Sequence, residues 1–370
     1  MKNARKVTIQ EATASYEEWL GEQILLLPED LERKHELMRS GPFPFLRATY
    51  YRWTQLWTQA PKRIREGREV LAVGDLHVEN FGTWRDVEGR LVWGVNDFDE
   101  ACRLPYTYDL LRLATSARLA VSDGKLQIEP KEADVAILAG YRDGLETGGR
   151  PFILAEQWRA LRRVAMAKMD RPDKFWEELD RLPTVAADRV PASAARALGR
   201  LLPTEGLPLR YAHRVAGLGS LGRQRFVAIT DWRGGKIARE AKAVARSAFI
   251  WSHGGPGETK ELYREILDKA IRCQDPFIAI SRRWIARRLS PDCTRIELND
   301  LKKEQEASRL LHVMGRETAN VHLGSATAAA LLVDLSSRPD GWLHEAVEEM
   351  LAAVEADWSA WKKDSGKSRD

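Results

Sequence analysis

VGDLHVENFG (residues 73–82) decides the fold of this chain together with VNDFDE (residues 95–100). The two motifs place an aspartate at 75, an asparagine five residues later and a second aspartate seventeen residues beyond that. Residues 68–73 end in an apolar stretch that predicts a strand leading into the first motif. Residues 83–95 predict a β-hairpin that turns around Glu88-Gly89. We therefore expect the hairpin to return Asp97 to the side of Asn80.

This spacing matches the groups that phosphoryl transfer requires. One carboxylate orients and deprotonates a hydroxyl, while an amide oxygen and a second carboxylate hold Mg²⁺. Magnesium prefers hard oxygen ligands and takes only one or two carboxylates from the protein. The expected roles are therefore a catalytic base at Asp75 and metal ligands at Asn80, Asp97 and Asp99.

Two other interpretations of these motifs stay open. Gly-Asp-x-His also begins the metal site of two-metal phosphoesterases, in which the aspartate and the histidine bind the first metal. Those enzymes need further ligands, typically from a Gly-Asn-His segment, which this chain lacks, and its seven histidines are scattered singly. Asp, Asn and Gly are also common in surface turns for backbone reasons alone.

A glycine-rich segment far downstream is the second candidate part of a site. Residues 217–222 read Gly-x-Gly-x-x-Gly, a pattern that is weak on its own. A strand over 226–230, a turn at 233–235 and a strand over 236–242 follow it. Strand, glycine loop, strand, turn and strand is the order found in kinases, whose glycine loop covers the nucleotide phosphates. The expected nucleotide contacts are Gly217, Gly219, Ser220 and Gly222, and the alternative is a glycine-rich hairpin without a ligand.

The strand over 236–242 is expected to supply a cation for the phosphates. Lys242, at its end, is the first candidate, with Arg239 and Lys236 as alternatives. Side chains alternate between the two faces of a strand, so Lys242 and Arg239 cannot both face one cleft without a bulge. An exposed charged strand is the simpler explanation of the same residues.

A helix predicted over residues 258–272 is expected to carry a glutamate that pairs with this cation. Its candidates are Glu258, Glu261 and Glu265, and the sequence does not choose among them. The preceding Gly-Pro-Gly-Glu-Thr-Lys segment is not a P-loop, because Gly-Lys-Ser/Thr is missing.

The first two motifs resemble the catalytic and metal loops of aminoglycoside and choline phosphotransferases. Over most of residues 35–325 the chain resembles an uncharacterised bacterial family, domain of unknown function 2252, through residues 38–47, 74–82 and 215–222. That family carries Lys-Glu-Ala after the glycine segment, where this chain has Arg239-Glu240-Ala241 and then Lys242, so the cation stays open. The resemblance to the phosphotransferases implies that Asp109 braces the catalytic loop. A helix-start carboxylate explains Asp109 equally well, and His77 is expected beside the site.

The order of these parts differs from that of kinases. Kinases run from glycine loop to catalytic aspartate to metal aspartate, whereas here both aspartates precede the glycine segment. Circular permutation produces such an order when the termini lie close together. The expected fold is therefore an α+β, two-lobed, protein kinase-like fold that is circularly permuted, with extra N- and C-terminal helices.

Four regions are expected in this fold. They are an N-terminal helical extension (1–69), a large catalytic lobe (70–205), a small nucleotide-binding lobe (206–300) and C-terminal helices that rejoin the large lobe (301–370). Helices are predicted over 105–116, 132–145, 152–169 and 304–322, and a strand over 284–289.

Composition indicates the number of lobes, the kind of partner and the cellular compartment, but it says little about the activity. A chain of 370 residues is long enough for two lobes. The 58 basic and 54 acidic residues give a net charge of +4, too balanced to indicate a nucleic-acid partner. Three widely spaced cysteines predict a reduced, cytoplasmic setting, and no apolar run predicts a membrane span.

The sequence therefore predicts a phosphotransferase that uses ATP and Mg²⁺ and acts on a hydroxyl of a small-molecule acceptor. Arg239 at the expected lysine position leaves a nucleotide-binding pseudoenzyme as the competing possibility. Transfer of AMP from the same pocket is the third.

Overall fold

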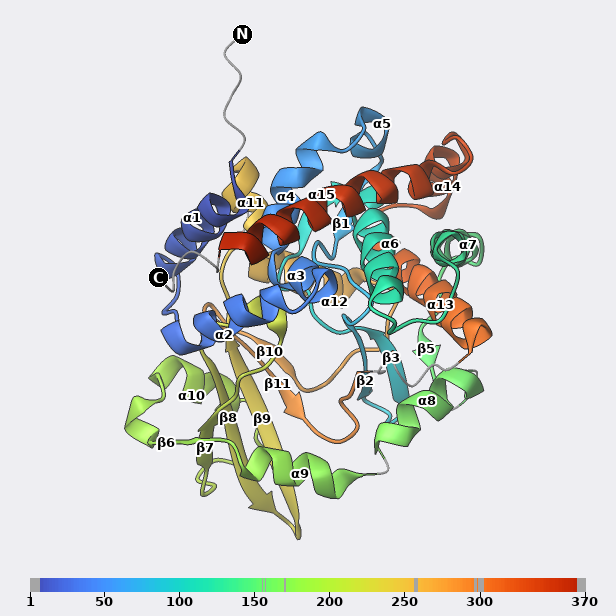
Figure 1. The fold of residues 1–370 in the computed structure, drawn as a ribbon. Helices are drawn as coiled ribbons and strands as arrows, with labels where there is room; N and C mark the ends of the chain where they lie inside the picture. Colours follow the sequence, from blue (N-terminus) through green and yellow to red (C-terminus); the bar gives the residue numbers. More distant parts are fainter. Residues whose placement is uncertain are drawn as a thin grey trace.

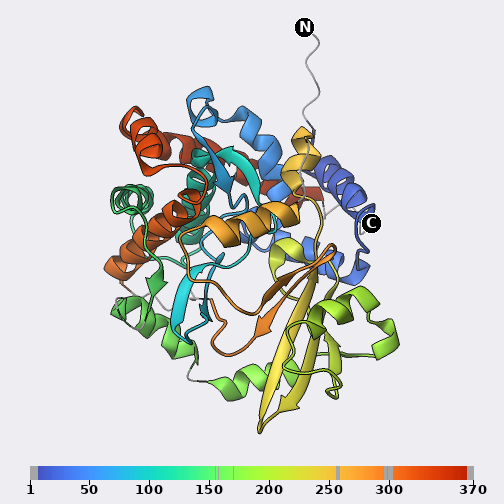
Figure 2. The ribbon, with the colours of Figure 1, turned by 180° about the vertical axis from the view of Figure 1, so that it is seen from behind.

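The computed structural model describes residues 7–154, 156, 158–169, 171–255, 259–295, 298 and 303–364. Helices and two small sheets form one part of the molecule, which we call the helical lobe (Figure 1). A larger sheet with two short helices forms the other, the sheet lobe (Figure 2). The expected mixture of α and β structure is confirmed.

The strands of the helical lobe form two antiparallel sheets. One pairs β1 (Glu69–Ala72) with β4 (Cys102–Pro105), and the other contains β2 (Phe81–Arg85), β3 (Leu91–Val95) and β5 (Phe152–Ile153). The hairpin predicted around Glu88-Gly89 is confirmed, with Phe81 opposite Val95 and Arg85 opposite Leu91. Gly89 allows the turn because its φ of 74° is strained for residues with a Cβ.

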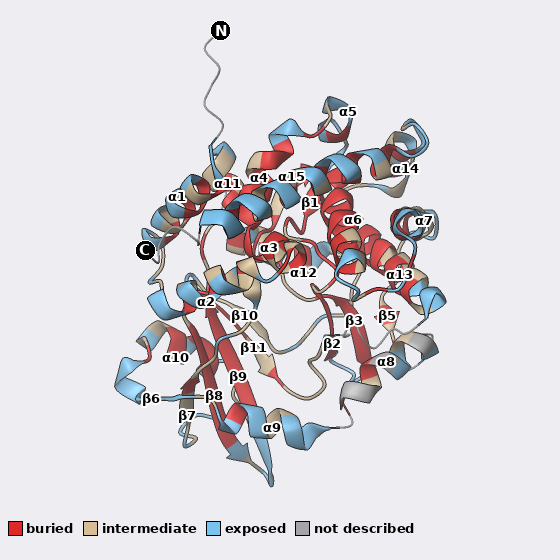
Figure 3. Cartoon of the chain, viewed as in Figure 1, coloured by how far each residue is buried: buried red, intermediate tan, exposed pale blue. Residues whose placement is uncertain are grey.

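The helices of this lobe surround the two small sheets and come from both ends of the chain. The inner helices α6 and α13 and the strands β2 and β3 are largely buried (Figure 3). The helices are α1 (Ile9–Gly21), α2 (Pro28–Arg39), α3 (Pro42–Ala48), α4 (Tyr50–Leu56), α5 (Lys62–Arg65), α6 (Tyr106–Ser122), α7 (Pro130–Glu146), α8 (Arg159–Met169), α11 (Ala248–His253), α12 (Thr259–Lys269), α13 (Glu304–His322), α14 (Ala328–Ser336) and α15 (Trp342–Asp364).

The sheet lobe contains a six-stranded antiparallel sheet in the order β10-β11-β9-β8-β7-β6. Its strands are β6 (Thr184–Val185), β7 (Arg210–His213), β8 (Arg225–Trp232), β9 (Gly235–Ala243), β10 (Ile278–Ile280) and β11 (Trp284–Leu289). Apolar side chains alternate along the strands, so α10 (Ala192–Gly199) packs on one face of the sheet and α9 (Pro172–Asp180) on the other.

The chain after β11 connects the two lobes. The Thr83 N–H donates to the carbonyl of Thr294 at 2.8 Å, and the Thr83 hydroxyl donates to the carbonyl of Asp292 at 2.7 Å. These bonds fix β2 of the helical lobe against the segment that follows β11.

Most predicted elements are present. The strand over 284–289 and the helix over 304–322 have the predicted bounds, and α6, α7 and α12 lie where helices were expected. The helix predicted from residue 152 is wrong at its start, because Phe152 and Ile153 pair with β3 and the helix begins at Arg159. Much of the charged C-terminal tail lies outside the described residues.

Glycines allow close contact between α7 and α13. A Cβ added to Gly140 would lie 1.8 Å from the carbonyl oxygen of His312, well inside contact distance. We expect Gly140→Ala to lower the free energy of unfolding by roughly 1–3 kcal/mol, the usual cost of overpacking. Urea unfolding measures it, with Gly199→Ala as the control, since Gly199 ends α10 with no atom within 4 Å of its added Cβ. Equal stability of the two variants would contradict the close contact.

Candidate functional site

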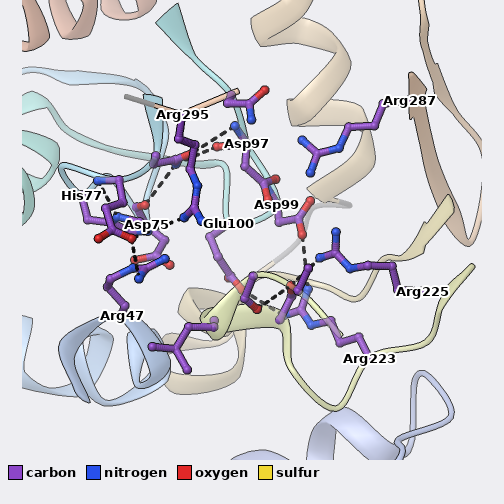
Figure 4. Close-up of a pocket in the computed structure, with 18 of the residues that line it drawn as sticks. Arg47, Asp75, His77, Asp97, Asp99, Glu100, Arg223, Arg225, Arg287 and Arg295 are labelled. Atoms are coloured by element: carbon purple, nitrogen blue, oxygen red, sulfur yellow. Dashed lines mark hydrogen bonds and ion pairs between the residues drawn. The ribbon is translucent and has the colours of Figure 1, made fainter. Parts of the chain in front are cut away.

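A cavity of about 410 Å³ lies between the two lobes (Figure 4). It brings together sequence segments that are more than a hundred residues apart: the two acidic motifs, the glycine segment and the end of β11. The expected site residues that line it are Asp75, His77, Asn80, Asp97, Asp99, Gly217, Gly219 and Ser220. Its volume is in the range typical of small-molecule sites.

Asp75 is held by an arginine from α6. Arg112 donates to its Oδ1 from Nη2 at 2.6 Å and from Nε at 3.1 Å, and its side chain is fully buried. Burial raises the pKa of Asp75, although the Arg112 guanidinium opposes the shift. The other oxygen, Oδ2, faces the glycine segment, since a Cβ added to Gly219 would lie 3.5 Å from it.

Asp109 fixes the backbone that carries Asp75. Its two carboxylate oxygens accept the N–H groups of Val73 at 2.7 Å and Gly74 at 2.9 Å. His322, from α13, also contacts Asp109, with Nε2 3.0 Å from Oδ2, and Tyr141 contacts the other ring nitrogen at 3.0 Å. Asp109 and His322 have no exposed side-chain surface. The carboxylate therefore joins the loop that carries Asp75 to α13.

Asn80 joins the two acidic motifs. Its Nδ2 donates to the carbonyls of Asp75 at 3.3 Å and Asp97 at 3.0 Å, and its Oδ1 accepts the N–H of Asp97 at 3.1 Å. The predicted return of Asp97 to the side of Asn80 is confirmed. The Asn80 carboxamide therefore contacts backbone groups of both acidic motifs.

Lys242 lies between Asp97 and Asp99. Its Nζ is 2.6 Å from Oδ2 of Asp97 and also pairs with Asp99. Burial alone would raise the pKa of Asp97, but Lys242 holds it well below its usual range. Burial and repulsion from Asp97 raise the pKa of Asp99 to about 6. Oδ1 of Asp99 is buried without a hydrogen-bond partner.

Three arginines surround Glu240, which is 1% exposed, on the cavity face of the sheet. Arg214 pairs with its carboxylate at 2.6 Å, Arg225 at 2.7 Å and Arg287 at 3.3 Å. Despite burial, these guanidinium groups hold the pKa of Glu240 well below its usual range. The cluster therefore carries two positive charges in excess, and its three arginines all line the cavity.

Strand alternation explains this cluster and corrects one expectation. Glu240 and Lys242 share the cavity face, with Arg287 opposite Glu240 and Arg225 opposite Lys242 in the register. Arg239 points to the other face, where its Nε donates to the carbonyl of Leu201 at 2.8 Å. The expectation that Arg239 faces the nucleotide cleft is therefore wrong.

Two further expected residues, Gly222 and Glu261, lie elsewhere. Gly222 packs against Leu31 instead of lining the cavity, and Glu261 is exposed on α12. The expected pairing of the strand cation with a helix glutamate is replaced by the pairing of Lys242 with Asp97 and Asp99. Glu258 lies outside the described residues.

The sequence interpretation also missed residues that line the cavity or hold its walls. They are Arg47, Arg112, Arg214, Arg223, Arg225, Glu240, Arg287 and Arg295. Arg225, Glu240 and Arg287 lie on strands that neighbour one another in the sheet, and the alternation of side chains along those strands was the available signal for these three. Arg47 and Arg112 had none, because their contacts depend on how distant helices pack.

Glu100 is a buried carboxylate behind the cavity. It accepts Arg223 Nη2 at 3.2 Å and the N–H of Ala248 at 2.7 Å, and burial raises its pKa to about 7. The folded protein therefore keeps a proton that the unfolded chain releases near pH 4.5. The resulting stability is complete below that pH and is lost as the pH rises towards 7.

We expect Glu100→Gln to make the free energy of unfolding less dependent on pH, because glutamine resembles the protonated acid. Between pH 4.5 and 7.5 the variant should lose roughly 1–3 kcal/mol less stability than the wild type, as a shift of this size implies. Urea titrations across the pH range measure it, with Glu177→Gln on the exposed surface of α9 as the control. Parallel pH profiles of Glu100→Gln and wild type would contradict the buried, protonated Glu100.

The donor atoms suit a hard cation only in part. Asp97 is 35% exposed to the cavity, and Asp99 has an unpartnered oxygen, both suited to Mg²⁺. Lys242 already balances one of the two carboxylates of this pair. Within the described residues, no group of three or more histidines, cysteines, aspartates and glutamates is placed to hold a metal ion.

Comparison with known proteins gives one match. The model of a family described as "Uncharacterized protein conserved in bacteria (DUF2252)" matches residues 26–201, which include both acidic motifs and end before the glycine segment. The resemblance to this family is confirmed for that range. No curated protein and no solved structure matches the chain. In the part of the chain that the structure describes, no helix is long and apolar enough to cross a membrane.

Proposed function

We propose that the chain is an ATP- and Mg²⁺-dependent phosphotransferase that acts on a hydroxyl of a small molecule, on a circularly permuted kinase-like fold. One observation carries the proposal: the glycine segment lies in the same cavity as Asp75 and Asp97. A nucleotide bound to the glycine segment would place its phosphates next to Asp75 and Asp97. The packing of α13 against the catalytic loop through His322 and Asp109 supports the permuted order.

Asp75 is the base in this proposal. Arg112 fixes Oδ1, which leaves Oδ2 to accept the proton of the acceptor hydroxyl. The hydroxyl oxygen then bonds to the γ-phosphorus as the bond to the β-phosphate oxygen breaks, and ADP leaves. The raised pKa of Asp75 makes its carboxylate a stronger base.

The phosphates would lie against the arginines of the sheet lobe. Arg214, Arg225 and Arg287 share one carboxylate, so their excess positive charge faces the cavity. One guanidinium group can donate two parallel hydrogen bonds to two oxygens of the same phosphate. The backbone N–H groups of the glycine segment add donors that carry no charge. Several arginines thus take the place of the single phosphate-binding lysine that kinases use.

Asp97, Asp99 and Asn80 would hold the metal ion. The ion would supply neutralisation of the charge that builds up on the transferred group. Lys242 balances one of these two carboxylates in the present structure, so at most one negative charge remains for the metal ion.

Gly219 stands close to the catalytic base. The added Cβ at this position would lie 3.0 Å from the carbonyl oxygen of Arg47 and 3.5 Å from Asp75 Oδ2. That gap holds about one carbon atom and excludes a phosphoryl group. We expect the glycine segment to move outward when substrate enters.

A nucleotide-binding protein without transfer activity is the second candidate. It is favoured by the pairing of Lys242 with both expected metal carboxylates and by the closed position of Gly219. In this form Lys242 occupies the carboxylates that would bind the metal ion, and Gly219 occupies the space that a phosphoryl group would need.

Product analysis separates these possibilities. Purified protein is incubated with ATP, with and without Mg²⁺, and the products are identified by mass spectrometry. ADP that forms only with Mg²⁺ supports the phosphotransferase. Release of pyrophosphate with an AMP adduct would show AMP transfer instead, and ATP binding without any product would show a pseudoenzyme.

A further inference from the structure

A second cavity, of about 390 Å³, lies on the face of the six-stranded sheet that α10 packs against. It is lined by Ile237 and Arg239 of β9, by residues 201–203 after α10 and by residues 276–277 before β10. Strands β8 and β9 extend beyond α10 (Figure 2), and the segment that follows this helix reaches β9 at the cavity. No described residue lines both cavities, which lie on opposite faces of the sheet.

Arg239 is the buried cation of this second cavity, with 5% of its surface exposed. Its Nε donates to the carbonyl of Leu201 at 2.8 Å, and its Nη1 donates to the carbonyl of Ala238 at 2.9 Å. Neither bond uses Nη2. Among the described residues, no carboxylate forms an ion pair with this guanidinium. A buried charge that meets only neutral acceptors is costly, because they replace only part of its hydration.

A second arginine increases this cost. Arg288 lies directly opposite Arg239 on β11, and like charges that face each other across two strands repel. The ring of Phe277 contacts both guanidinium groups, with its centroid 4.9 Å from Arg239 and 4.5 Å from Arg288. Burial and, after it, repulsion from Arg288 lower the pKa of Arg239 to about 10. The arrangement therefore favours an anion next to Arg239.

The acidic groups near Arg239 do not supply that anion. No acidic residue is among the described residues that line this cavity. Asp275 attracts Arg239, but it lines the other cavity, and three other arginines are its main charged partners. Burial raises the pKa of the nearby Cys293 thiol, which is therefore neutral. Arg200, exposed at the rim, adds a further positive charge.

The rest of the wall is apolar and includes Leu201, Trp232, Ile237 and Phe277. A cavity of this volume suits a small molecule, and apolar walls favour a ligand with an apolar body. A carboxylate matches the two-donor geometry of one guanidinium and carries a single charge. A doubly charged phosphate would leave charge unbalanced in apolar surroundings.

We propose that this cavity binds a small carboxylate with an apolar body, whose carboxylate oxygens accept hydrogen bonds from Nη2 of Arg239. The apolar body packs against Trp232 and Phe277. Binding neutralises Arg239 and so reduces its repulsion from Arg288. The site is separate from the cavity between the lobes and does not depend on the proposed phosphotransferase activity.

Calorimetric titration of the full chain tests the proposal. The probes are benzoate and hexanoate, with benzamide as the uncharged analogue. We expect at least one carboxylate to bind at millimolar concentration, and benzamide to bind about tenfold more weakly than benzoate, as the loss of one charged hydrogen bond implies. Arg239→Met should weaken carboxylate binding by about the same factor. Arg181→Met is the matched control, because the Arg181 side chain is 77% exposed at the end of α9.

Urea unfolding without ligand gives a second readout. Arg239→Met removes a buried charge that no described carboxylate balances, so its unfolding midpoint should equal or exceed that of the wild type. Arg225→Met should lower the midpoint, because it removes a partner from the buried Glu240 on the other face of the sheet. Ile237→Trp fills the cavity and keeps Arg239, so it should prevent carboxylate binding even if Arg239→Met fails to fold.

Three binding results would overturn the proposal: no binding of either carboxylate, benzamide binding as tight as benzoate binding, or carboxylate binding that Arg239→Met and Ile237→Trp leave unchanged. The third would place the anion on the arginines of the cavity between the lobes. A midpoint for Arg239→Met as low as that for Arg225→Met would also overturn it, because Arg239 would then have a charged partner already. Since no nucleotide is present, none of these outcomes depends on phosphate transfer.

Discussion

Asp97→Asn should reduce Mg²⁺-dependent ATP turnover by about two to three orders of magnitude, the loss that follows removal of one group that stabilises transition-state charge. Asp97 is the most accessible carboxylate of the pair that Lys242 joins, and 35% of its side chain faces the cavity. Its pKa lies well below the usual range because Lys242 outweighs burial, so the group is ionised at every pH used for assay. Asparagine keeps the shape and removes the charge.

The substitution should leave the fold intact. Lys242 keeps its ion pair with Asp99 in the variant, so no unpaired buried charge results. Turnover is measured as ADP formed, and stability by thermal unfolding, with Asp173→Asn on the surface of α9 as the control. Turnover within tenfold of the wild type in a folded Asp97→Asn variant would reject Asp97 as a metal ligand.

Asp109→Ala should cause the largest loss of stability among single substitutions near the site. It would leave the N–H groups of Val73 and Gly74 without acceptors and His322 without its carboxylate partner. Removal of one partner from a buried pair costs about 3–5 kcal/mol. Because these partners lie at residues 73–74 and on α13, the loss should also loosen the loop that carries Asp75.

Urea unfolding measures this loss, with Asp173→Ala as the exposed control. Asp109→Asn provides a second test if the alanine variant fails to fold, because its carboxamide oxygen still accepts one of the two N–H groups. The asparagine variant should be intermediate in stability. A stability of Asp109→Ala within 1 kcal/mol of the control would show that Asp109 does not brace the loop.

Local signals in the sequence predicted the hairpin and the acidic motifs. The turn at Glu88-Gly89 sets the register of β2 and β3, and that register fixes the distance between Asn80 and Asp97. The same kind of signal predicted α13, whose apolar residues repeat with helical spacing. In both cases the information lies within about twenty residues.

The contacts around the cavity depend on distant packing and were harder to predict. The sequence allowed Lys242, Arg239 or Lys236 as the cation, and only the pairing of β9 with β8 and β11 shows which of them faces the cavity. Lys236 pairs with Asp180 on α9 instead. The helix glutamate expected from kinases was wrong because Asp97 and Asp99 already balance Lys242.

The N-terminal region contributes more to the site than the sequence indicated. It was expected as a helical extension, yet Arg47 and Tyr50 line the cavity, and the backbone carbonyl of Leu46 accepts a hydrogen bond from Arg112 at 2.8 Å. The N–H of Leu27 also donates to the carbonyl of Gly222 at 2.8 Å. The region of α2 and α3 therefore supports both Asp75, through Arg112, and the glycine segment.

In the proposed complex, one nucleotide contacts the glycine segment and the second acidic motif together. Hydrogen exchange of the full chain, with and without ATP and Mg²⁺, tests it most directly, because bound ligand slows the opening of the segments it contacts. We expect slower exchange in residues 214–224 and in residues 95–99 at the same nucleotide concentration. Protection of only one segment, or of neither, would contradict a shared phosphate site.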